Sequence, residues 1–198
     1  MGSFATMMRV GYDPNIHSGR LRRLDRSCYC GKAWVHWTMA IEDRRTGWLT
    51  EPMHRGLREG LLHSVARHDL ICPMSCLMPD HGHFLIGGLH SAPDAFDQRL
   101  AIRSFRMEWN RWLAQFPMPY KLQKQAYDYV LTEEERKRDA FEEVAHYIRE
   151  NPVRGEVAID AMEWSYSGSL AVGYPDLDPR QPDFWERFWR ISAHAAKG

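Results

Sequence analysis

Two periodicities of hydrophobic and polar residues divide the 198-residue chain into segments. Runs rich in β-branched, aromatic and other apolar residues predict four β-strands, at 33–42, 70–77, 81–87 and 125–131. Apolar residues spaced three or four positions apart predict three helices, at 52–68, 93–116 and 132–151. The elements therefore follow the order β-α-β-β-α-β-α, which indicates an α+β fold.

The first six elements have the order of a ferredoxin-like sandwich, in which two helices cover one face of an antiparallel sheet. A turn at 78–80 separates the second and third strands, so these strands are expected to form a hairpin. Thr132 and Glu135 match a capping box and predict the start of the third helix, which Pro152 would end. We therefore expect a ferredoxin-like antiparallel sheet with an added C-terminal helix and an irregular C-terminal extension.

Composition divides the chain into three regions. Residues 1–31 form a basic arm, residues 32–155 hold the predicted sheet and helices, and residues 156–198 form an aromatic-rich extension. The 44% share of apolar residues predicts a folded protein with a hydrophobic core. No apolar run reaches the roughly 20 residues of a membrane-spanning helix, and the N-terminus lacks the apolar core of a signal peptide. We therefore expect a cytoplasmic protein with no membrane partner.

The charges are balanced overall but unevenly distributed along the chain. There are 26 basic and 26 acidic residues, and 21 of the basic residues are arginine. Residues 1–125 hold 17 basic and 11 acidic residues, whereas residues 126–198 hold 9 and 15. Arginine suits bidentate contacts with phosphate and stacking on bases, so a zero net charge does not exclude a nucleic-acid partner. We expect a polarised surface, with the nucleic acid on its basic face.

Cysteines and a pair of histidines are candidate metal ligands. Four cysteines form CxC and CxxxC patterns at 28–30 and 72–76, and neither pattern has the CxxC spacing of a zinc ribbon. We interpret them as buried thiols, with a metal site as the alternative. His81 and His83 lie two positions apart on a predicted strand, so both point to one face and could present two imidazoles to one cation. A hydrogen-bonded pair of core histidines is the other interpretation.

The segment HYIRENPVRG at 146–155 contains a further candidate. Tyr147 and Asn151 are four positions apart and are therefore neighbours on one face of a helix. They could be a half-buried tyrosine and a helix-terminal asparagine, or a nucleophile and a metal ligand. Glu143 and His146 lie near Tyr147, but we interpret both as surface charges and assign neither as a general base.

Two segments of the chain carry a resemblance to a known family. LMPDHGHFLI at 77–86 resembles the His-hydrophobic-His signature of the HUH single-tyrosine transposases, and HYIRENPVRG resembles their tyrosine helix. Together with RRL at 22–24 before a strand, they most resemble the REP-associated tyrosine transposase branch, over about residues 20–170. The chain departs from that family at Gly82, where a bulky hydrophobic residue is usual, and we expect weaker strand packing there without an effect on the imidazoles.

The resemblance implies metal-dependent nicking and strand transfer on single-stranded DNA, carried out by an HUH transposase-like catalytic domain at residues 32–155. By position, His81, His83 and Asn151 would hold Mg²⁺ or Mn²⁺, which polarises the scissile phosphate. Tyr147 would form a 5′-phosphotyrosine, from which a phenol can leave again. The resemblance also implies hairpins of repetitive extragenic palindromes beside a guide tetranucleotide as substrate, and a monomer that is nucleoid-associated when bound.

Arginine side chains are the candidates for DNA contacts. They are Arg20, Arg22, Arg23 and Arg26 in the arm, and Arg99, Arg103 and Arg106 on the second predicted helix. A solvated helix face is the other interpretation of the second group. Two other functions are open: a domesticated hairpin-binding protein without transposition activity, and an unrelated metal-dependent hydrolase, which the lack of an HExxH helix disfavours.

Overall fold

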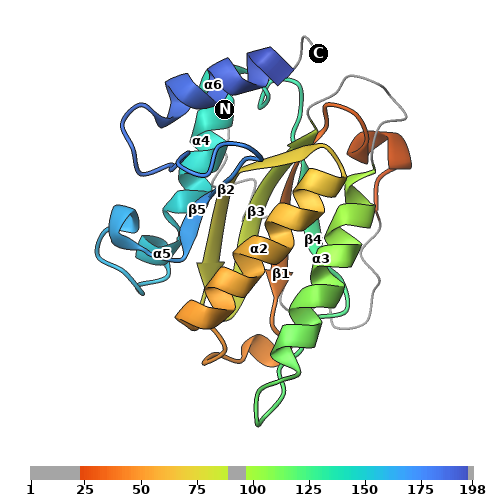
Figure 1. Cartoon of the computed structure of the whole chain (residues 1–198), viewed down its shortest axis with the longest axis vertical. Helices are drawn as coiled ribbons and strands as arrows, with labels where there is room; N and C mark the ends of the chain where they lie inside the picture. Colours follow the sequence, from red (N-terminus) through yellow and green to blue (C-terminus); the bar gives the residue numbers. More distant parts are fainter. Residues whose placement is uncertain (1–22, 89–96, 196–198) are drawn as a thin grey trace.

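Figure 1 shows a five-stranded antiparallel sheet with helices on both faces. The computed structural model describes residues 23–88 and 97–195. The strands are β1 (Trp34–Ala40), β2 (Leu70–Met78), β3 (His81–Gly88), β4 (Tyr127–Val130) and β5 (Ser167–Leu170). The α-helices are α2 (Glu51–Arg67), α3 (Gln98–Leu113), α4 (Arg138–Arg149), α5 (Asn151–Arg154) and α6 (Phe184–Ala195). The strand order β4-β1-β3-β2-β5 confirms the predicted ferredoxin-like arrangement of the first four strands.

Local capping contacts explain where the first two helices begin. The Thr50 hydroxyl accepts a hydrogen bond from the Met53 amide at the start of α2, and Pro52 lies in the first turn, where a missing N–H is tolerated. The Asp97 carboxylate accepts from the Arg99 amide at the start of α3. None of the described helices has the length and apolar character needed to cross a bilayer.

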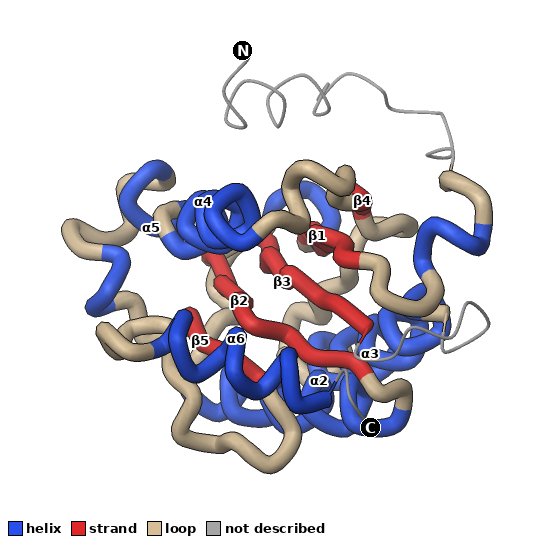
Figure 2. The backbone as a smooth tube through the Cα atoms, turned by 90° about the horizontal axis from the view of Figure 1, so that it is seen from above, coloured by secondary structure: helices blue, strands red, loops and turns tan. Residues whose placement is uncertain are grey.

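The larger hydrophobic core lies between the sheet and the helices α2 and α3. Side chains on a pleated strand alternate between faces, and Val35, Trp37 and Phe84 point into this core. Phe84, Phe105 and Trp109 meet there with ring centroids 5.5 to 5.9 Å apart. Figure 2 shows α2 and α3 together on one side of the sheet and α4 on the other. Along β1 and β3, the residues that alternate with these core positions therefore point to the opposite face, toward α4.

The opposite face of the sheet is covered by α4 and α6. Phe141 of α4 stacks on Phe188 of α6, with ring centroids 5.8 Å apart and an interplanar angle of 3°. Trp34 of β1 packs edge-on against Phe141 at 4.7 Å. Ile148, about two turns further along α4, is fully buried in the same core. These contacts fix the helix that carries Tyr147 against the sheet.

The C-terminal extension is not irregular, contrary to the expectation from sequence. Residues 167–170 pair as β5 with the outer edge of β2, and the Ser75 hydroxyl donates to the Gly168 carbonyl at 2.9 Å. Phe184 and Phe188 of α6 are almost fully buried and complete the second core. The sequence SGSL has no alternation of apolar and polar residues, so its pattern does not predict a strand. Backbone pairing with β2 forms this strand instead.

The start of α4 lies six residues later than the sequence predicts. Thr132 and Glu135 do form the reciprocal bonds of a capping box, at 3.3 Å from the Glu135 amide and 2.8 Å from the Thr132 amide. These bonds close only a single turn, because Lys137 is extended (φ −65°, ψ 145°). The helix itself begins at Arg138.

The end of the tyrosine helix also differs from the prediction. α4 ends at Arg149, and after Glu150 the chain passes directly into α5. Pro152 lies in the first turn of α5, where the missing N–H is tolerated, so it does not end the helical path. Asn151 is therefore the first residue of α5, one turn beyond Tyr147.

Part of the predicted basic arm is packed into the fold. Tyr29 has no exposed surface, and its hydroxyl donates to the Asp128 carboxylate of β4. Arg23 pairs with the same carboxylate, and its guanidinium lies 5.0 Å from the centre of the Trp37 ring. Residues 23–31 therefore belong structurally to the folded body rather than to a free arm.

The close approach of Trp34 to Gly87 generates a test of the packing. A Cβ at Gly87 would lie 2.2 Å from Cε3 of Trp34, and displacing the indole would disturb its contact with Phe141. We expect Gly87→Ala to lower the free energy of unfolding by about 1–3 kcal/mol, as overpacking does, measured by urea denaturation. Gly82→Ala is the control on the same strand, since its Cβ first meets the flexible end of Leu77, and it should cost less. Equal losses would contradict this explanation.

Candidate active site

His81 and His83 lie on β3, the central strand of the sheet, and face α4. Their Nε2 atoms are 2.9 Å apart. Gly82 between them faces the other core, where Leu77 and Phe84 fill the space that a larger residue would need. The weaker packing expected at Gly82 is therefore not found, and both imidazoles are carried by a well-packed strand.

An acidic residue holds the far side of His81. Its Nδ1 atom is 2.6 Å from Oδ1 of Asp80, and Asp80 pairs with Arg44 at 3.1 Å. Partial burial raises the pKa of Asp80, but the contacts with His81 and Arg44 outweigh it and leave the pKa below its ordinary value. The carboxylate accepts a hydrogen bond from Nδ1 of His81, so Nε2 is the ring nitrogen directed toward His83.

The far side of His83 is held by β1. Its Nδ1 atom is 3.0 Å from Nε2 of His36 and 3.2 Å from Oγ1 of Thr38. Burial lowers the pKa of His36 to about 3 and the pKa of His83 well below its ordinary value, and the nearby His81 adds to both shifts. Both buried rings are therefore neutral, which is the form of imidazole that binds metal ions.

The two Nε2 atoms have the separation of adjacent ligands on one metal ion. With metal–nitrogen distances of about 2.1 Å and octahedral angles, adjacent ligand atoms lie about 3.0 Å apart, and the observed distance is 2.9 Å. Imidazole nitrogens also suit a divalent transition metal. In the described part of the chain, no group of three His, Cys, Asp or Glu side chains could hold a metal. A third protein ligand would therefore be of another type, such as the amide oxygen of Asn151.

Tyr147 and Asn151 meet at the junction of α4 and α5. The Asn151 amide nitrogen donates to the carbonyls of Tyr147 (3.1 Å) and Ile148 (2.9 Å), which leaves Oδ1 as the atom able to ligate a cation. The guanidinium carbon of Arg154 lies 4.0 Å from the centre of the Tyr147 ring, and Nη1 donates to the Tyr147 carbonyl at 2.9 Å. Arg154 therefore restrains the tyrosine ring from one side.

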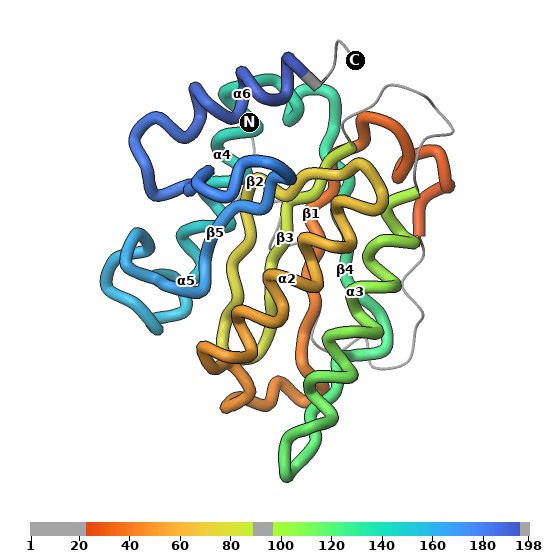
Figure 3. Tube along the Cα trace, in the orientation of Figure 1, coloured from red at the N-terminus to blue at the C-terminus, as the bar shows by residue number. Residues whose placement is uncertain are grey.

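The end of α5 lies beside the histidine hairpin. A Cβ at Gly155 would be 2.8 Å from the terminal methyl of Met78, which pairs with His81 in the hairpin. Arg154 is near enough to His83 to contribute to the lowered pKa of that imidazole, after burial and the neighbouring histidines. Figure 3 shows α4 leading into α5 along the β2 side of the sheet. The fold thus brings both sequence motifs to one face, although no hydrogen bond of the described residues joins Asn151 to a histidine.

A groove of about 550 Å³ lies beside Tyr147. One wall is α4, and the other comes from the C-terminal extension at Pro179 and Trp185. Acidic and basic side chains are interspersed around it, and they are Asp139, Glu142, Glu143, His146, Arg149 and Arg154. The segregation of charge along the sequence therefore does not give a basic surface at the candidate nucleophile, and the expectation of a polarised surface is wrong there.

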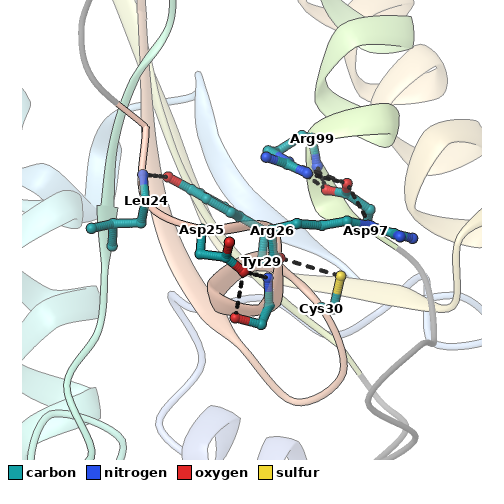
Figure 4. A network of polar contacts seen from close by, with 8 residues as sticks. Leu24, Asp25, Arg26, Tyr29, Cys30, Asp97 and Arg99 are labelled. Carbon is teal, nitrogen blue, oxygen red and sulfur yellow. Dashed lines mark hydrogen bonds and ion pairs between the residues drawn. The ribbon is translucent and has the colours of Figure 1, made fainter.

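Several arginines predicted to contact DNA have partners within the protein. Figure 4 shows Arg99 donating to both oxygens of Asp97, at 2.7 to 3.1 Å, and Arg26 directed toward the same carboxylate. The distance from Arg26 Nε to Asp97 is 3.5 Å, and the Arg26 side chain is largely exposed. Arg23 is engaged by Asp128. Of this group, Arg26 has the side chain best exposed to a ligand.

The arginines of α3 do not form a uniform row. Arg103 is exposed, whereas Arg106 is partly buried and donates to the Gln123 carbonyl at 2.5 Å. Burial lowers the pKa of Arg106 to about 10, and the nearby positive charge of Arg23 adds to the shift. The remaining predicted contacts, Arg20 and Arg22, lie outside the described residues.

The four cysteines are free thiols in the structure. Cys30, Cys72 and Cys76 are buried, and burial raises the pKa of Cys72 and of Cys76 to about 12. A raised pKa keeps such a thiol protonated and unreactive. The interpretation as buried thiols therefore holds for three of the cysteines, whereas Cys28 is only half-buried.

Comparison with known proteins rests on structure alone. No protein-family model matches the sequence, and no curated protein matches it. A REP-associated tyrosine transposase solved with a REP hairpin superposes with a TM-score of 0.61 at 16% identity, covering 76% of this chain and 82% of that chain. This chain has the same fold. A protein of Deinococcus radiodurans R1 described as a candidate transposase aligns at 18% identity over 67% of this chain and 95% of that chain. Its TM-score of 0.42 is too low to show a shared fold.

Sequence reasoning misses several side chains of the candidate site, among them His36, Thr38 and Arg154. His36 and Thr38 reach His83 only through the pairing of β1 with β3, and His36 and His83 are 47 positions apart. Local patterns contain no signal for such a contact. Arg154 was detectable, because it lies seven residues after Tyr147 in the same helical segment and therefore on the same face.

The neutral buried histidines generate a prediction about pH and stability. His36 and His83 take up protons only when the protein unfolds, because burial lowers the pKa of each below the ordinary value of 6.5. The unfolded state then binds more protons than the folded state below pH 6.5, so stability falls as the pH falls. Between pH 6.5 and 4.5 we expect protonation of His36 in the unfolded state to cost about 2 kcal/mol of stability, because its folded-state pKa is about 3, measured by urea unfolding. His83 should add a loss in the same direction.

An exposed histidine provides the control for this measurement. His63 is on the outer surface of α2, and His63→Gln should leave the slope of stability against pH unchanged. A flat profile in the wild-type protein between pH 6.5 and 4.5 would contradict the assignment of neutral buried rings.

Proposed function

We propose that this chain cuts and rejoins single-stranded DNA beside a hairpin, with Tyr147 as the nucleophile. The observation that supports this most directly is the pair of imidazoles on β3, His81 and the buried His83, whose Nε2 atoms have the spacing of ligands to one metal ion. The helix that carries Tyr147 packs on the same face of the sheet. The fold is shared with a REP-associated tyrosine transposase whose structure contains a REP hairpin.

His81, His83 and Asn151 would hold a divalent ion, Mg²⁺ or Mn²⁺. The bound ion would supply Lewis-acid chemistry at the oxygens of the scissile phosphate. Both histidines would ligate through Nε2, because their Nδ1 atoms already have partners in Asp80 and His36. Asn151 would ligate through Oδ1, because its nitrogen is committed to backbone carbonyls.

Tyr147 carries out the covalent step of the proposed reaction. Its phenolic oxygen loses its proton and forms a bond to phosphorus, while the bond from phosphorus to the 3′ oxygen breaks. The 3′ oxygen takes up a proton and leaves as a 3′-OH, and the 5′-phosphate stays on the tyrosine. An incoming 3′-OH can reverse the step, because a phenol with a reference pKa near 10 is a good enough leaving group. The number of phosphoester bonds is conserved, so no external energy source is required.

Arg154 is placed to assist at the same phosphate. One nitrogen of its guanidinium group is held by the Tyr147 carbonyl, and the group stacks on the ring that would attack. The remaining N–H groups can donate to a phosphate oxygen, and charged donors of this kind make the strongest hydrogen bonds to phosphate. Arg154 would therefore align the phosphate with Tyr147 and balance negative charge during attack.

The proposed substrate is a REP-type DNA hairpin with a single-stranded flank. The flank would enter the groove beside Tyr147, where Trp185 offers a surface on which a base can stack. The exposed Arg26 and Arg103 are candidates for contacts with hairpin phosphates. A monomer is proposed because the resemblance to REP-associated tyrosine transposases implies one, and such a DNA partner implies a cytoplasmic, nucleoid-associated protein.

A hairpin-binding protein that has lost transposition is the second candidate function. Both functions require DNA binding. The internal contacts made by Arg23, Arg99 and Arg106 therefore do not distinguish between them. Only the covalent step distinguishes them.

The first test looks for the phosphotyrosine. A hairpin oligonucleotide with flanks of varied tetranucleotide sequence is labelled at its 3′ end, since the tyrosine keeps the strand on the 3′ side of the cut. With Mn²⁺, the wild-type protein should give a labelled adduct that survives denaturing electrophoresis. Tyr147→Phe should abolish the adduct and retain a native-gel shift, because only the hydroxyl is removed.

Tyr174→Phe serves as the matched control, because Tyr174 is an exposed tyrosine outside the site. It should form the adduct at the wild-type rate. A wild-type protein that shifts the hairpin but forms no adduct would favour the binding-only function. An adduct of undiminished yield in Tyr147→Phe would show that another residue is the nucleophile.

The second test removes Arg154. Arg154→Ala should slow adduct formation on the order of 100-fold, as the loss of one donor to a developing negative charge does, measured as a single-turnover rate. Arg190→Ala is the charge-matched control, since Arg190 is an exposed residue of α6 paired with Glu186. Unchanged rates in Arg154→Ala would restrict this arginine to a structural role at the end of α5.

A further inference from the structure

A row of buried polar side chains extends from the histidine pair into β1. Nε2 of His36 is 3.0 Å from Nδ1 of His83, and Oγ1 of Thr38 is 3.2 Å from the same nitrogen. The rings of His36 and His83 have centroids 5.1 Å apart. His36 is only 2% exposed and lies against the edge of His83 opposite to Nε2. It therefore contacts neither DNA nor an ion bound between the two Nε2 atoms.

Packing alone does not account for a histidine at position 36. Its own Nδ1 atom is buried and has no hydrogen-bond partner among the described residues. A buried polar group without a partner costs about 1–3 kcal/mol, and an apolar ring of similar size would occupy the same space without that cost. The histidine is better explained by what its Nε2 atom does for His83.

The positions of the protons on a metal-binding imidazole indicate what His36 does for His83. A neutral imidazole carries a proton on one nitrogen and a lone pair on the other. If Nε2 of His83 binds a metal ion, its proton lies on Nδ1 and requires an acceptor. His36 Nε2 and Thr38 Oγ1 are acceptors at hydrogen-bond distance, as Asp80 is for His81 at 2.6 Å. Each histidine of the pair thus has its own acceptor behind it.

We propose that His36, supported by Thr38, is a positioning residue that accepts the Nδ1 proton of His83 and holds its Nε2 lone pair beside that of His81. Without this acceptor, His83 takes the other tautomer and donates Nε2–H to Nε2 of His81 across their 2.9 Å separation. That hydrogen bond uses both nitrogens that would bind the ion and so competes with it. The inference rests on the proposed function only in taking a divalent metal ion as the ligand of the histidine pair.

Metal binding to the full chain in the absence of DNA tests the inference. Mn²⁺ affinity is measured by isothermal titration calorimetry for the wild-type protein, His36→Phe and His36→Gln. Phenylalanine fills the site but accepts no hydrogen bond, so the affinity should fall about 10- to 100-fold, as for other partners of metal-ligating histidines. Glutamine brings an amide oxygen that can accept from His83 and should restore most of the affinity. Thr38→Val should cause a smaller loss.

A second measurement reads the tautomer directly. With diamagnetic Mg²⁺ present, ¹⁵N NMR of the imidazoles should show the His83 proton on Nδ1 in the wild-type protein. The same spectra of His36→Phe should show the Nε2–H form of His83. Urea unfolding of each variant establishes that it is folded under the conditions of both measurements.

The outcomes separate this inference from the proposed reaction. Wild-type affinity in His36→Phe, or equal weakness of the Phe and Gln variants, would overturn the positioning role. Mn²⁺ binding that survives His81→Ala combined with His83→Ala, or no Mn²⁺ binding by the wild-type protein, would overturn it as well. A protein that binds Mn²⁺ through the two histidines but forms no Tyr147 adduct leaves the positioning role in place and removes the proposed reaction.

Discussion

Burial of His83 on the central strand is the constraint on which the candidate site depends. β3 has a neighbouring strand on each side and helices on both faces, so polar atoms on it must find partners within the protein. His83 satisfies this requirement by placing one nitrogen against His36 and the other against His81. The same burial keeps the ring uncharged. An uncharged His83 offers a cation a lone pair without carrying the desolvation cost of an ionised group.

The protein has two hydrophobic cores, one on each face of the sheet. One packs the sheet against α2 and α3, and the other positions the helix that carries Tyr147. The core under α2 and α3 is built from the predicted β-α-β-β-α-β elements and packs against the paired strands β1 and β3. The core on the other face depends on distant parts of the chain, because Phe141 of α4 packs between Trp34 of β1 and Phe188 of α6. The position of Tyr147 relative to the histidines therefore depends on residues that lie outside both sequence motifs.

What the sequence predicts correctly follows from local geometry. Strand alternation places His81 and His83 on one face, and helical spacing makes Tyr147 and Asn151 neighbours, whatever the rest of the fold does. What it does not predict depends on contacts between distant positions, such as the pairing that brings His36 to His83. Short sequence motifs also mispredict the structure where another contact competes. The capping box closes a single turn and does not begin the helix. Of the regularly spaced arginines, Arg99 pairs with Asp97 and Arg106 donates to a backbone carbonyl.

The pairing of β5 with β2 has a consequence for how separate molecules of this protein meet. All nine residues of β2 are buried, and its outer edge would otherwise present unpaired N–H and C=O groups along an apolar strand. Such edges join to the sheets of other molecules and start aggregation. The four residues of β5 pair with that edge between Cys72 and Cys76, and the opposite edge strand, β4, is equally short and carries Asp128, which pairs with Arg23. The extension thus contributes to keeping the protein dispersed at high concentration, independently of any chemistry at Tyr147.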